Sequence, residues 1–443
     1  MDLTDLEATQ LVSMIVSDEI SSLELVEACI ARIDAKEEEI GAWTHLDYDF
    51  ARKQAKNADS YHASGAPCGP LHGIPVGIKD IFDTADYPTE NGTILDAGRK
   101  PDLDCTVVSR LIASGAIIMG KTVTTEMAVY SPGKTANPHD VIRTPGGSSS
   151  GSAAAVACGM VPLAIGSQTN GSVIRPASFC GLVGFKPTHG RISRAGVLAL
   201  SRNLDHVGVF ARSIEDAALI AECLSGHDPK DPDTELKPSP KLVETTNQDP
   251  PIEPRFAFIK TPAWQHADPA TQNAFEKLAK FLGDGCDEVT LPLEFDAVIS
   301  DFHHVMMADL AKNLGPYYRR GKEKISDVLK GLIEEGLAVK AVDYNTSIDR
   351  RAALNAWIQD YGSEYDAIIT PATIGEAPVG LDTTGNPLFC SLWTYLGVPA
   401  VSLPLMKGEN NMPIGVQVVS ARGDDARLLR SARWLTKKVA SEE

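Results

Sequence analysis

Residues 146–172 read GGSSSGSAAAVACGMVPLAIGSQTNGS, and the fold of the chain is best inferred from this stretch. Two serines stand in glycine-rich turns, Ser148 near its start and Ser172 at its end. Between them, the Ala-rich segment 151–160 predicts a tightly packed buried helix, and the apolar run 161–165 predicts a strand. Because glycine lets backbone N–H groups turn toward a ligand, a serine in such a turn is a candidate nucleophile with its own oxyanion site.

Strand and helix patterns alternate on both sides of this stretch. The apolar run 74–78 ends at Lys79, and the loop that holds Ser172 also follows an apolar run. The alternation predicts an α/β fold whose sheet is covered by helices on both faces. Functional loops in such sheets lie at strand ends, so we expect Lys79 and Ser172 to converge at one end of the sheet. The same pattern predicts helices at 104–114 and 424–439 and strands at 116–119, 366–370, 398–403 and 414–420.

Residues 1–65 carry helical signals. The segments 4–7 (TDLE) and 21–24 (SSLE) both fit a capping box, the arrangement that begins many helices. Apolar residues recur at helical spacing after the second box, namely Val26, Cys29, Ile30 and Ile33. This spacing predicts a buried helix face, and we expect an N-terminal helical wrap over 1–65.

The chain is predicted to form a single domain over 1–443. Residues 226–254 are rich in Pro, Asp and Lys, a composition that predicts a surface linker. Residues 256–360 have the texture of variable helical material, and we expect a cap-like segment over the cleft there.

The charge balance argues against two classes of partner. The chain of 443 residues carries 41 Lys and Arg against 59 Asp and Glu, a formal net charge of −18. It therefore lacks the basic footprint that binds nucleic acid or an anionic membrane. No run of about 18 apolar residues is present, so we expect no transmembrane helix.

The cysteines and the N-terminus favour a cytoplasmic protein. Eight cysteines occur singly, without a C-x-x-C pair, which is typical of reduced thiols. Residues 1–5 are acidic and lack the basic region of a signal peptide, so we expect none. The chain has no H-E-x-x-H motif, and His303 and His304 are adjacent rather than one helical turn apart. We therefore expect no metal and no cofactor.

Two other motifs overlap the serine-rich turn. Residues 147–151 formally fit G-x-S-x-G, which would make Ser149 the nucleophile of an α/β-hydrolase. That motif needs a hydrophobic strand directly before it, and residues 136–145 do not supply one. The same run lacks the G-K-[ST] ending of a phosphate-binding loop.

Three sequence blocks together resemble the amidase signature family. They are the lysine block 73–80 (GIPVGIKD), the block 146–151 (GGSSSG) and the block 171–177 (GSVIRPA), in the order and at the spacing of that family. Weaker matches run on to the C-terminus, at 179–188, 397–400 and 413–417. The resemblance covers nearly the whole chain and implies an α/β fold with a large mixed sheet covered by helices. It also implies an amidase that cleaves a C–N bond in a small amide through an acyl-enzyme.

The family uses a Ser-cisSer-Lys triad, and the resemblance assigns its parts to residues of this chain. Ser172 matches the nucleophile, Ser148 the bridging serine and Lys79 the base. A lysine acts as a base only when neutral, and burial after an apolar run favours the neutral form, provided that Asp80 points elsewhere. The family's oxyanion hole maps onto the backbone N–H groups of Thr169, Asn170, Gly171 and Ser172.

This chain departs from many relatives near the nucleophile. Gln168 stands in place of an Asp, and Asn170 in place of a glycine, where its side chain could contact the substrate. Arginine often comes two positions after the nucleophile, whereas here Arg175 comes three positions after it. Arg175 could clamp a substrate carboxylate, as in half-amides of small diacids, or it could pair with an Asp or Glu of the protein. Met127 and Tyr130 are further candidate substrate contacts, although buried packing suits Met127 better.

The resulting hypothesis is a cytoplasmic amidase with a small-molecule amide and water as its reactants. Urethane, carbamate or anilide hydrolysis by the same mechanism is one alternative. The amidase subunit of a tRNA-dependent amidotransferase is another, and a binding protein that has lost its chemistry is a third. Related proteins are often dimers, so a homodimer is an option for this chain.

Overall fold

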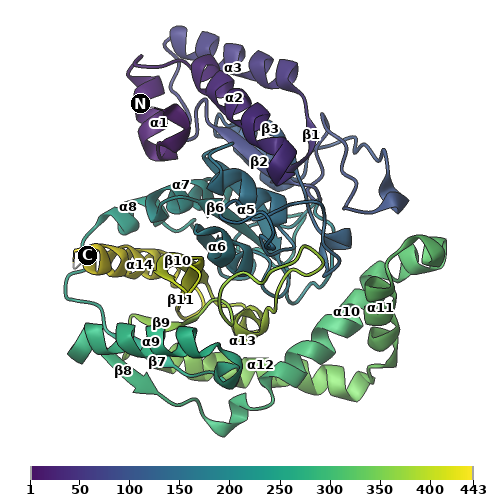
Figure 1. Cartoon of the computed structure of the whole chain (residues 1–443), viewed down its shortest axis with the longest axis vertical. Helices are drawn as coiled ribbons and strands as arrows, with labels where there is room; N and C mark the ends of the chain where they lie inside the picture. Colours follow the sequence, from purple (N-terminus) through teal and green to yellow (C-terminus); the bar gives the residue numbers. More distant parts are fainter. Residues whose placement is uncertain (1, 442–443) are drawn as a thin grey trace.

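One continuous eleven-stranded sheet forms the centre of the computed structural model, which describes residues 2–441 (Figure 1). Its strands follow the order β1-β3-β2-β4-β6-β5-β10-β11-β9-β7-β8. Their bounds are β1 (Trp43–Leu46), β2 (Pro75–Lys79), β3 (Ile117–Thr122), β4 (Leu163–Gln168), β5 (Val183–Lys186), β6 (His206–Ala211), β7 (Phe256–Ile259), β8 (Cys286–Val289), β9 (Ala367–Pro371), β10 (Ala400–Lys407) and β11 (Pro413–Val419).

The sheet is mixed. β2 is parallel to both of its neighbours, β3 and β4, whereas β4, β6, β5, β10, β11 and β9 pair antiparallel in succession. The other edge is parallel again, with β7 between β8 and β9. This arrangement confirms the predicted α/β class and the large mixed sheet.

Helices cover both faces of the sheet (Figure 1). The α-helices are α1 (Ala8–Val16), α2 (Ser22–Ile40), α3 (Tyr48–Ala63), α4 (Thr106–Ala113), α5 (Ser150–Ala157), α6 (Ile174–Cys180), α7 (Ile214–Leu224), α8 (Leu242–Asn247), α9 (Pro269–Leu282), α10 (Val298–Gly321), α11 (Asp327–Ala338), α12 (Ala341–Tyr361), α13 (Leu388–Leu396) and α14 (Asp425–Ala440). Short 3-10 helices are η1 (Leu3–Asp5), η2 (Ile94–Asp96), η3 (Glu126–Ala128), η4 (Trp264–His266), η5 (Gly283–Gly285), η6 (Leu293–Phe295) and η7 (Lys322–Lys324). None of the helices within residues 2–441 combines the length and the apolar character needed to cross a bilayer.

The two ends of the sheet are covered by different parts of the chain. The helices α1 to α3 gather at one end, and α9 to α12 at the other, where the α10–α11 pair projects outward (Figure 1). Both segments also add edge strands to the sheet that the sequence patterns did not predict. β1 lies within the expected helical wrap 1–65, and β7 and β8 lie within the expected cap 256–360. All four residues of β7 (FAFI) are buried, because β8 and β9 flank this strand on both sides.

The two predicted capping boxes have different outcomes. Ser21 caps α2 as predicted, since its Oγ accepts from the Glu24 N–H at 3.1 Å and its own N–H donates to the Glu24 carboxylate at 2.7 Å. The box at Thr4 is wrong, because Asp2 caps η1 and α1 begins only after Glu7.

The predicted linker 226–254 is wrong in part, because much of it is anchored. It contains α8, and three of its carboxylates form short bonds to the protein body. Asp228 accepts from Ser193 Oγ at 2.5 Å, Asp231 pairs with Arg194 at 2.8 Å, and Asp233 also lies on Arg194.

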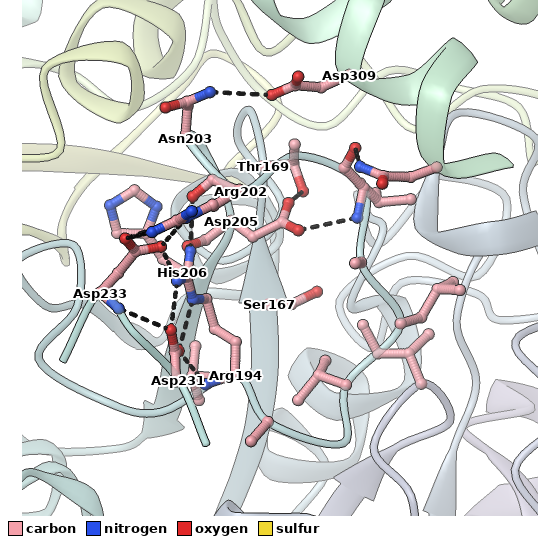
Figure 2. Close-up of a pocket in the computed structure, with 18 of the residues that line it drawn as sticks. Ser167, Thr169, Arg194, Arg202, Asn203, Asp205, His206, Asp231, Asp233 and Asp309 are labelled. Atoms are coloured by element: carbon pink, nitrogen blue, oxygen red, sulfur yellow. Dashed lines mark hydrogen bonds and ion pairs between the residues drawn. The ribbon is translucent and has the colours of Figure 1, made fainter. Parts of the chain in front are cut away.

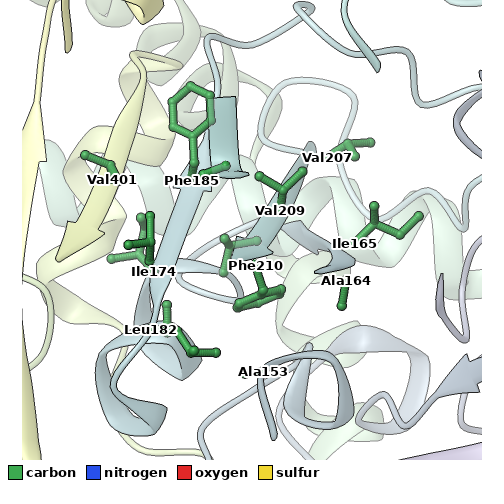
Figure 3. Packing of buried hydrophobic residues seen from close by; sticks show 14 of the residues in the cluster. Ala153, Ala164, Ile165, Ile174, Leu182, Phe185, Val207, Val209, Phe210 and Val401 are labelled. Atoms are coloured by element: carbon green, nitrogen blue, oxygen red, sulfur yellow. The ribbon is translucent and has the colours of Figure 1, made fainter. Parts of the chain in front are cut away.

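The core beside the serine loops is built from small and aromatic side chains. Ala153 of α5 and Ile174 of α6 face the strands that carry Ala164, Phe185 and Phe210 (Figure 3). Most side chains of α5 are alanine or serine, so this helix packs closely on β4, as the sequence pattern predicted. The packing fixes the two loops at either end of this unit.

We expect Phe185→Ala to lower the free energy of unfolding by about 3–5 kcal/mol, because it opens a cavity in this core. Phe185 is fully buried in β5, whereas Phe281, at the end of α9, is 38% exposed. The matched control Phe281→Ala is therefore expected to cost much less. Urea unfolding of both variants tests this, and equal losses would contradict the packing described here.

Candidate active site

Lys79 is the last residue of the buried strand β2, which places its side chain at the end of the sheet. Its side chain is fully buried, and Nζ lies 2.7 Å from Ser148 Oγ and 2.8 Å from Ser167 Oγ. Burial lowers the pKa of Lys79 well below its ordinary value, against the opposing charge of Asp205. A neutral amine in this position can accept a proton from Ser148.

The neighbouring carboxylate, Asp80, points away from Lys79, as the sequence argument required. Its Oδ1 lies 3.2 Å from Lys121 Nζ, and the same carboxylate accepts from the Glu90 N–H. Lys121 is itself buried and donates to the Thr89 hydroxyl at 2.6 Å. The charge of Asp80 is thus balanced by a second lysine, and it does not hold Lys79 in the protonated form.

Ser148 lies in the turn that leads into α5, and the Gly147–Ser148 peptide bond is cis. The side chain is 1% exposed. Gly146 has φ of +82°, and a Cβ there would lie 2.8 Å from Pro176 Cα, so the turn needs a glycine at this position. The loop is therefore held tightly against the start of α6.

Ser172 follows β4 by a four-residue step and is 7% exposed. Within residues 2–441, its hydroxyl makes no hydrogen bond to Ser148. Hydrogen bonds between catalytic groups are often long before substrate binds. The structure thus brings Lys79 and Ser148 into direct contact, with Ser167 as a third partner that the sequence did not predict.

Helix α13 anchors the loop from Thr169 to Ser172. Gln168 Oε1 accepts from the N–H groups of Val173 and Ile174 at 2.8 and 2.9 Å, and its Nε2 donates to Thr394 Oγ1 at 3.0 Å. The Thr394 hydroxyl also donates to the Asn170 carbonyl at 2.5 Å. Gln168 therefore ties the loop both to α6 and to α13.

The side chain of Asn170 is engaged with the protein. Its Nδ2 donates to the Tyr130 hydroxyl at 3.0 Å, and its Oδ1 accepts from Ser391 Oγ at 2.8 Å. The sequence suggested a contact between this side chain and the substrate, but both ends of the amide are already bonded. Tyr130 reaches the same loop, whereas Met127 is fully buried and its N–H donates to the Asn91 carbonyl at 2.8 Å.

Asp205 braces the loop from the opposite side (Figure 2). Its Oδ1 accepts from Thr169 Oγ1 at 2.6 Å, and its Oδ2 accepts from the N–H groups of Leu200 and Ser201. Burial raises the pKa of Asp205 to about 6. The loop that contains Ser172 is thus fixed between α13 and Asp205.

Arg175 takes neither of the two positions expected for it. Its side chain is 1% exposed, and its two terminal nitrogens donate to the carbonyls of Gly385 and Gly147, each at 2.7 Å. The guanidinium therefore connects α6 to the turn of Ser148. This placement argues against a clamp for a substrate carboxylate, because backbone carbonyls occupy the donors that such a clamp would use.

One cluster among residues 2–441 has the composition of a metal site. The ligand atoms of His45, Asp80 and Glu90 all lie within 4.8 Å of one another. However, the ammonium group of Lys121 lies on Asp80 and would repel a cation, and the Gly98 N–H donates to Glu90 at 2.6 Å. The donors are better explained by these partners than by a metal.

Two cavities flank the loop of Ser172. The first, the polar cavity, has a volume of about 580 Å³ and is walled in part by Ser167, Thr169 and Asp205 (Figure 2). The second, the α10 cavity, has a volume of about 640 Å³ and is walled in part by Asn170, Tyr130 and α10. Both are large enough for a small organic ligand.

Comparison with known proteins adds an independent line of evidence. The family model described as Amidase matches residues 24–429. The A-type subunits of glutamyl-tRNA(Gln) amidotransferase from Streptomyces coelicolor and Salinispora arenicola are each 32% identical to the chain. The alignments cover 97% and 99% of this chain and 95% and 98% of those proteins.

Solved structures give the same result. A chain from a vestigial protein complex, described as revealing the evolutionary origins of an s-triazine catabolic enzyme, superposes with a TM-score of 0.91 at 28% identity, covering 98% of each chain. The 6-aminohexanoate cyclic dimer hydrolase superposes with a TM-score of 0.86 at 26% identity, covering 99% of this chain and 98% of that one. The peptide amidase of Stenotrophomonas maltophilia gives a TM-score of 0.84 at 25% identity, covering 98% and 97%.

Asp205→Asn is expected to move the acidic limb of the pH–rate profile to lower pH. Activity needs neutral Lys79, so the rate rises with pH through the pKa of this lysine. The charge of Asp205 raises that pKa, and its removal lowers it. The measurement is kcat/KM for an amide across pH in the wild type and the variant.

Asp309→Asn is the matched control for this shift. Asp309 also lines the polar cavity, but its carboxylate bonds to Ser201 and Tyr344 and does not bear on the Lys79 pKa. A limb that stays in place in Asp205→Asn, or that moves equally in Asp309→Asn, would contradict the assigned interaction.

Proposed function

The chain belongs to the amidase family and is an amide-bond hydrolase, and we propose that Ser172, Ser148 and Lys79 carry its reaction. The observation on which this proposal rests is the contact of 2.7 Å between Lys79 Nζ and Ser148 Oγ in a fully buried environment. The substrate is a small amide, and urethanes, carbamates and anilides are alternatives with the same mechanism.

In the proposed acylation step, neutral Lys79 takes the proton of Ser148, and Ser148 takes the proton of Ser172. The Ser172 oxygen attacks the carbonyl carbon, and the C=O electron pair moves onto oxygen. The backbone N–H groups of residues 169–172 stabilise this oxyanion, and each such donor typically contributes about a hundredfold to a thousandfold in rate. Because these donors belong to the backbone, the bonds of Gln168 and Asp205 that fix the loop matter for catalysis.

The C–N bond breaks when the leaving nitrogen receives a proton. Ser148 supplies that proton and is reprotonated by the ammonium group of Lys79. Water then attacks the ester on Ser172 through the same relay, which releases the acid and restores the free enzyme. No group other than the three side chains and water is needed for proton balance.

Ser172→Ala and Lys79→Met are each expected to lower kcat/KM for the best amide by at least about a thousandfold, since each removes a member of the relay. Ser150→Ala is the control, because Ser150 lies in the same turn but is bonded only weakly, to the Val123 carbonyl at 3.4 Å. It should change the rate less than tenfold. Release of ammonia from a panel of amides measures all three.

A fluorophosphonate provides a second test of the nucleophile. Peptide mapping should place the adduct on Ser172 in the wild type and find none in Ser172→Ala. An adduct on Ser149 would instead favour the rejected G-x-S-x-G motif. No adduct and no turnover of any amide would favour a protein that has lost its chemistry.

The names of the relatives support a second candidate, a component of an amidotransferase complex. The relatives are 32% identical over nearly their whole length. Such a component needs partner chains, so this candidate predicts that the tagged chain co-purifies with other proteins from its own cells. Turnover of a free amide by the purified chain alone would favour the stand-alone hydrolase.

A further inference from the structure

The loop of Ser172 separates two cavities of different chemical character. Ser167 and Thr169 line the polar cavity, and Asn170 lines the α10 cavity. Adjacent residues of one loop thus face different compartments. An amide bound at Ser172 has two substituents, one on the carbonyl carbon and one on the nitrogen, and the geometry has to distribute them.

The position of the proton donor decides which side receives the nitrogen. In the proposed reaction, Ser148 protonates the leaving nitrogen, so the nitrogen must lie within hydrogen-bond reach of Ser148. Ser148 contacts Lys79, and Lys79 contacts Ser167, which is a wall of the polar cavity. The nitrogen therefore faces the polar cavity, and the acyl substituent extends toward Asn170.

The α10 cavity begins at the catalytic loop itself. The Tyr130 hydroxyl accepts from Asn170 and lies 3.8 Å from Met306 Sδ, which belongs to α10. A Cβ on Gly171 would lie 3.0 Å from Pro387 Cβ, another wall of this cavity. A chain attached to the carbonyl carbon would therefore pass Tyr130 and reach Met306.

The walls of the α10 cavity are mainly apolar. Ile299, Phe302 and Met306 come from α10, and Leu332 and Leu388 come from α11 and α13.

Charged groups on these walls do not favour an anion. The lining contains no lysine or arginine, and it includes one carboxylate, that of Asp296. Half-exposed His303 pairs with Glu335 at 2.7 Å, and His304 lies 3.2 Å from Ser347 Oγ. A carboxylate on the acyl chain would lose its hydration here without gaining a cation.

We propose that the α10 cavity is the acyl subsite of the enzyme and that it selects amides with an uncharged, apolar acyl group. Met306 is its specificity-determining residue, because it lies where the cavity meets the Tyr130–Asn170 pair. This inference rests on the proposed function and adds the substrate class. It reverses the preference for anionic half-amides that the position of Arg175 in the sequence suggested.

The test is a set of primary amides measured by ammonia release with the wild type. Acetamide, butyramide and hexanamide form the length series. The isosteric pair 5-methylhexanamide and glutaramate differs only in an isopropyl group against a carboxylate. We expect kcat/KM to rise by up to roughly fourfold for each added methylene and to favour 5-methylhexanamide over glutaramate by about a hundredfold.

Variants assign the effect to the cavity. Met306→Asp should reduce the ratio of kcat/KM for hexanamide to that for acetamide to about one, whereas Met306→Leu should keep it, because volume and polarity change little. Leu337→Asp places the same charge on α11 at a side chain that is 68% exposed, and it should leave the ratio unchanged. Thermal unfolding checks that each variant is folded.

The outcomes separate this inference from the proposed function. Turnover of acetamide with no gain along the series, or a preference for glutaramate, would overturn the acyl subsite and leave the hydrolase intact. A ratio that survives Met306→Asp in a folded variant would also overturn it. Failure of every amide, acetamide included, would overturn the proposed function and the subsite together.

Discussion

The structure depends on a lysine held without charge at the end of a buried strand. The side chain of Lys79 has no access to solvent, and its amine contacts two serine hydroxyls. A protonated amine there would lack a carboxylate partner, because Asp80 is bound to Lys121 and Asp205 is bound to the loop of Thr169. The surrounding elements are arranged so that both nearby carboxylates are occupied elsewhere, which is the condition for a basic lysine at neutral pH.

This arrangement explains why so much polar structure surrounds one short loop. An oxyanion site made of backbone N–H groups has no side chain of its own to adjust, so its geometry is set by whatever fixes the backbone. Gln168 and Thr394 fix it from α13, and Asp205 fixes it through Thr169. Arg175 performs the same service for the turn of Ser148, since its guanidinium bonds to the Gly147 carbonyl.

The sequence predicted the local parts of this site and missed the distant ones. Lys79, Ser148 and Ser172 each stand in a short motif whose glycines and apolar flanks can be read directly. Ser167 and Thr394 carry no such signal, because their function arises from contacts with residues 88 and 226 positions away.

Arg175 shows the limit of a motif argument about specificity. Its distance along the chain from the nucleophile suggested a substrate clamp, but α6 turns the side chain toward the backbone of two loops. The misjudged linker has the same cause, since its carboxylates are held by Arg194 and Ser193, which the sequence pattern could not bring near.

Chemistry and specificity are supplied by different parts of the chain, and they meet at Asn170. The strands β2 and β4 carry Lys79 and the oxyanion loop, whereas α10 and α11 supply the apolar wall of the α10 cavity. α13 belongs to both, because Ser391 and Thr394 hold the loop while Leu388 lines the cavity. Side chains on α10 can therefore change without moving the loop, and changes on the inner face of α13 cannot. Divergence of substrate preference in such a fold is expected to concentrate in α10 and α11, where it leaves the proton relay in place.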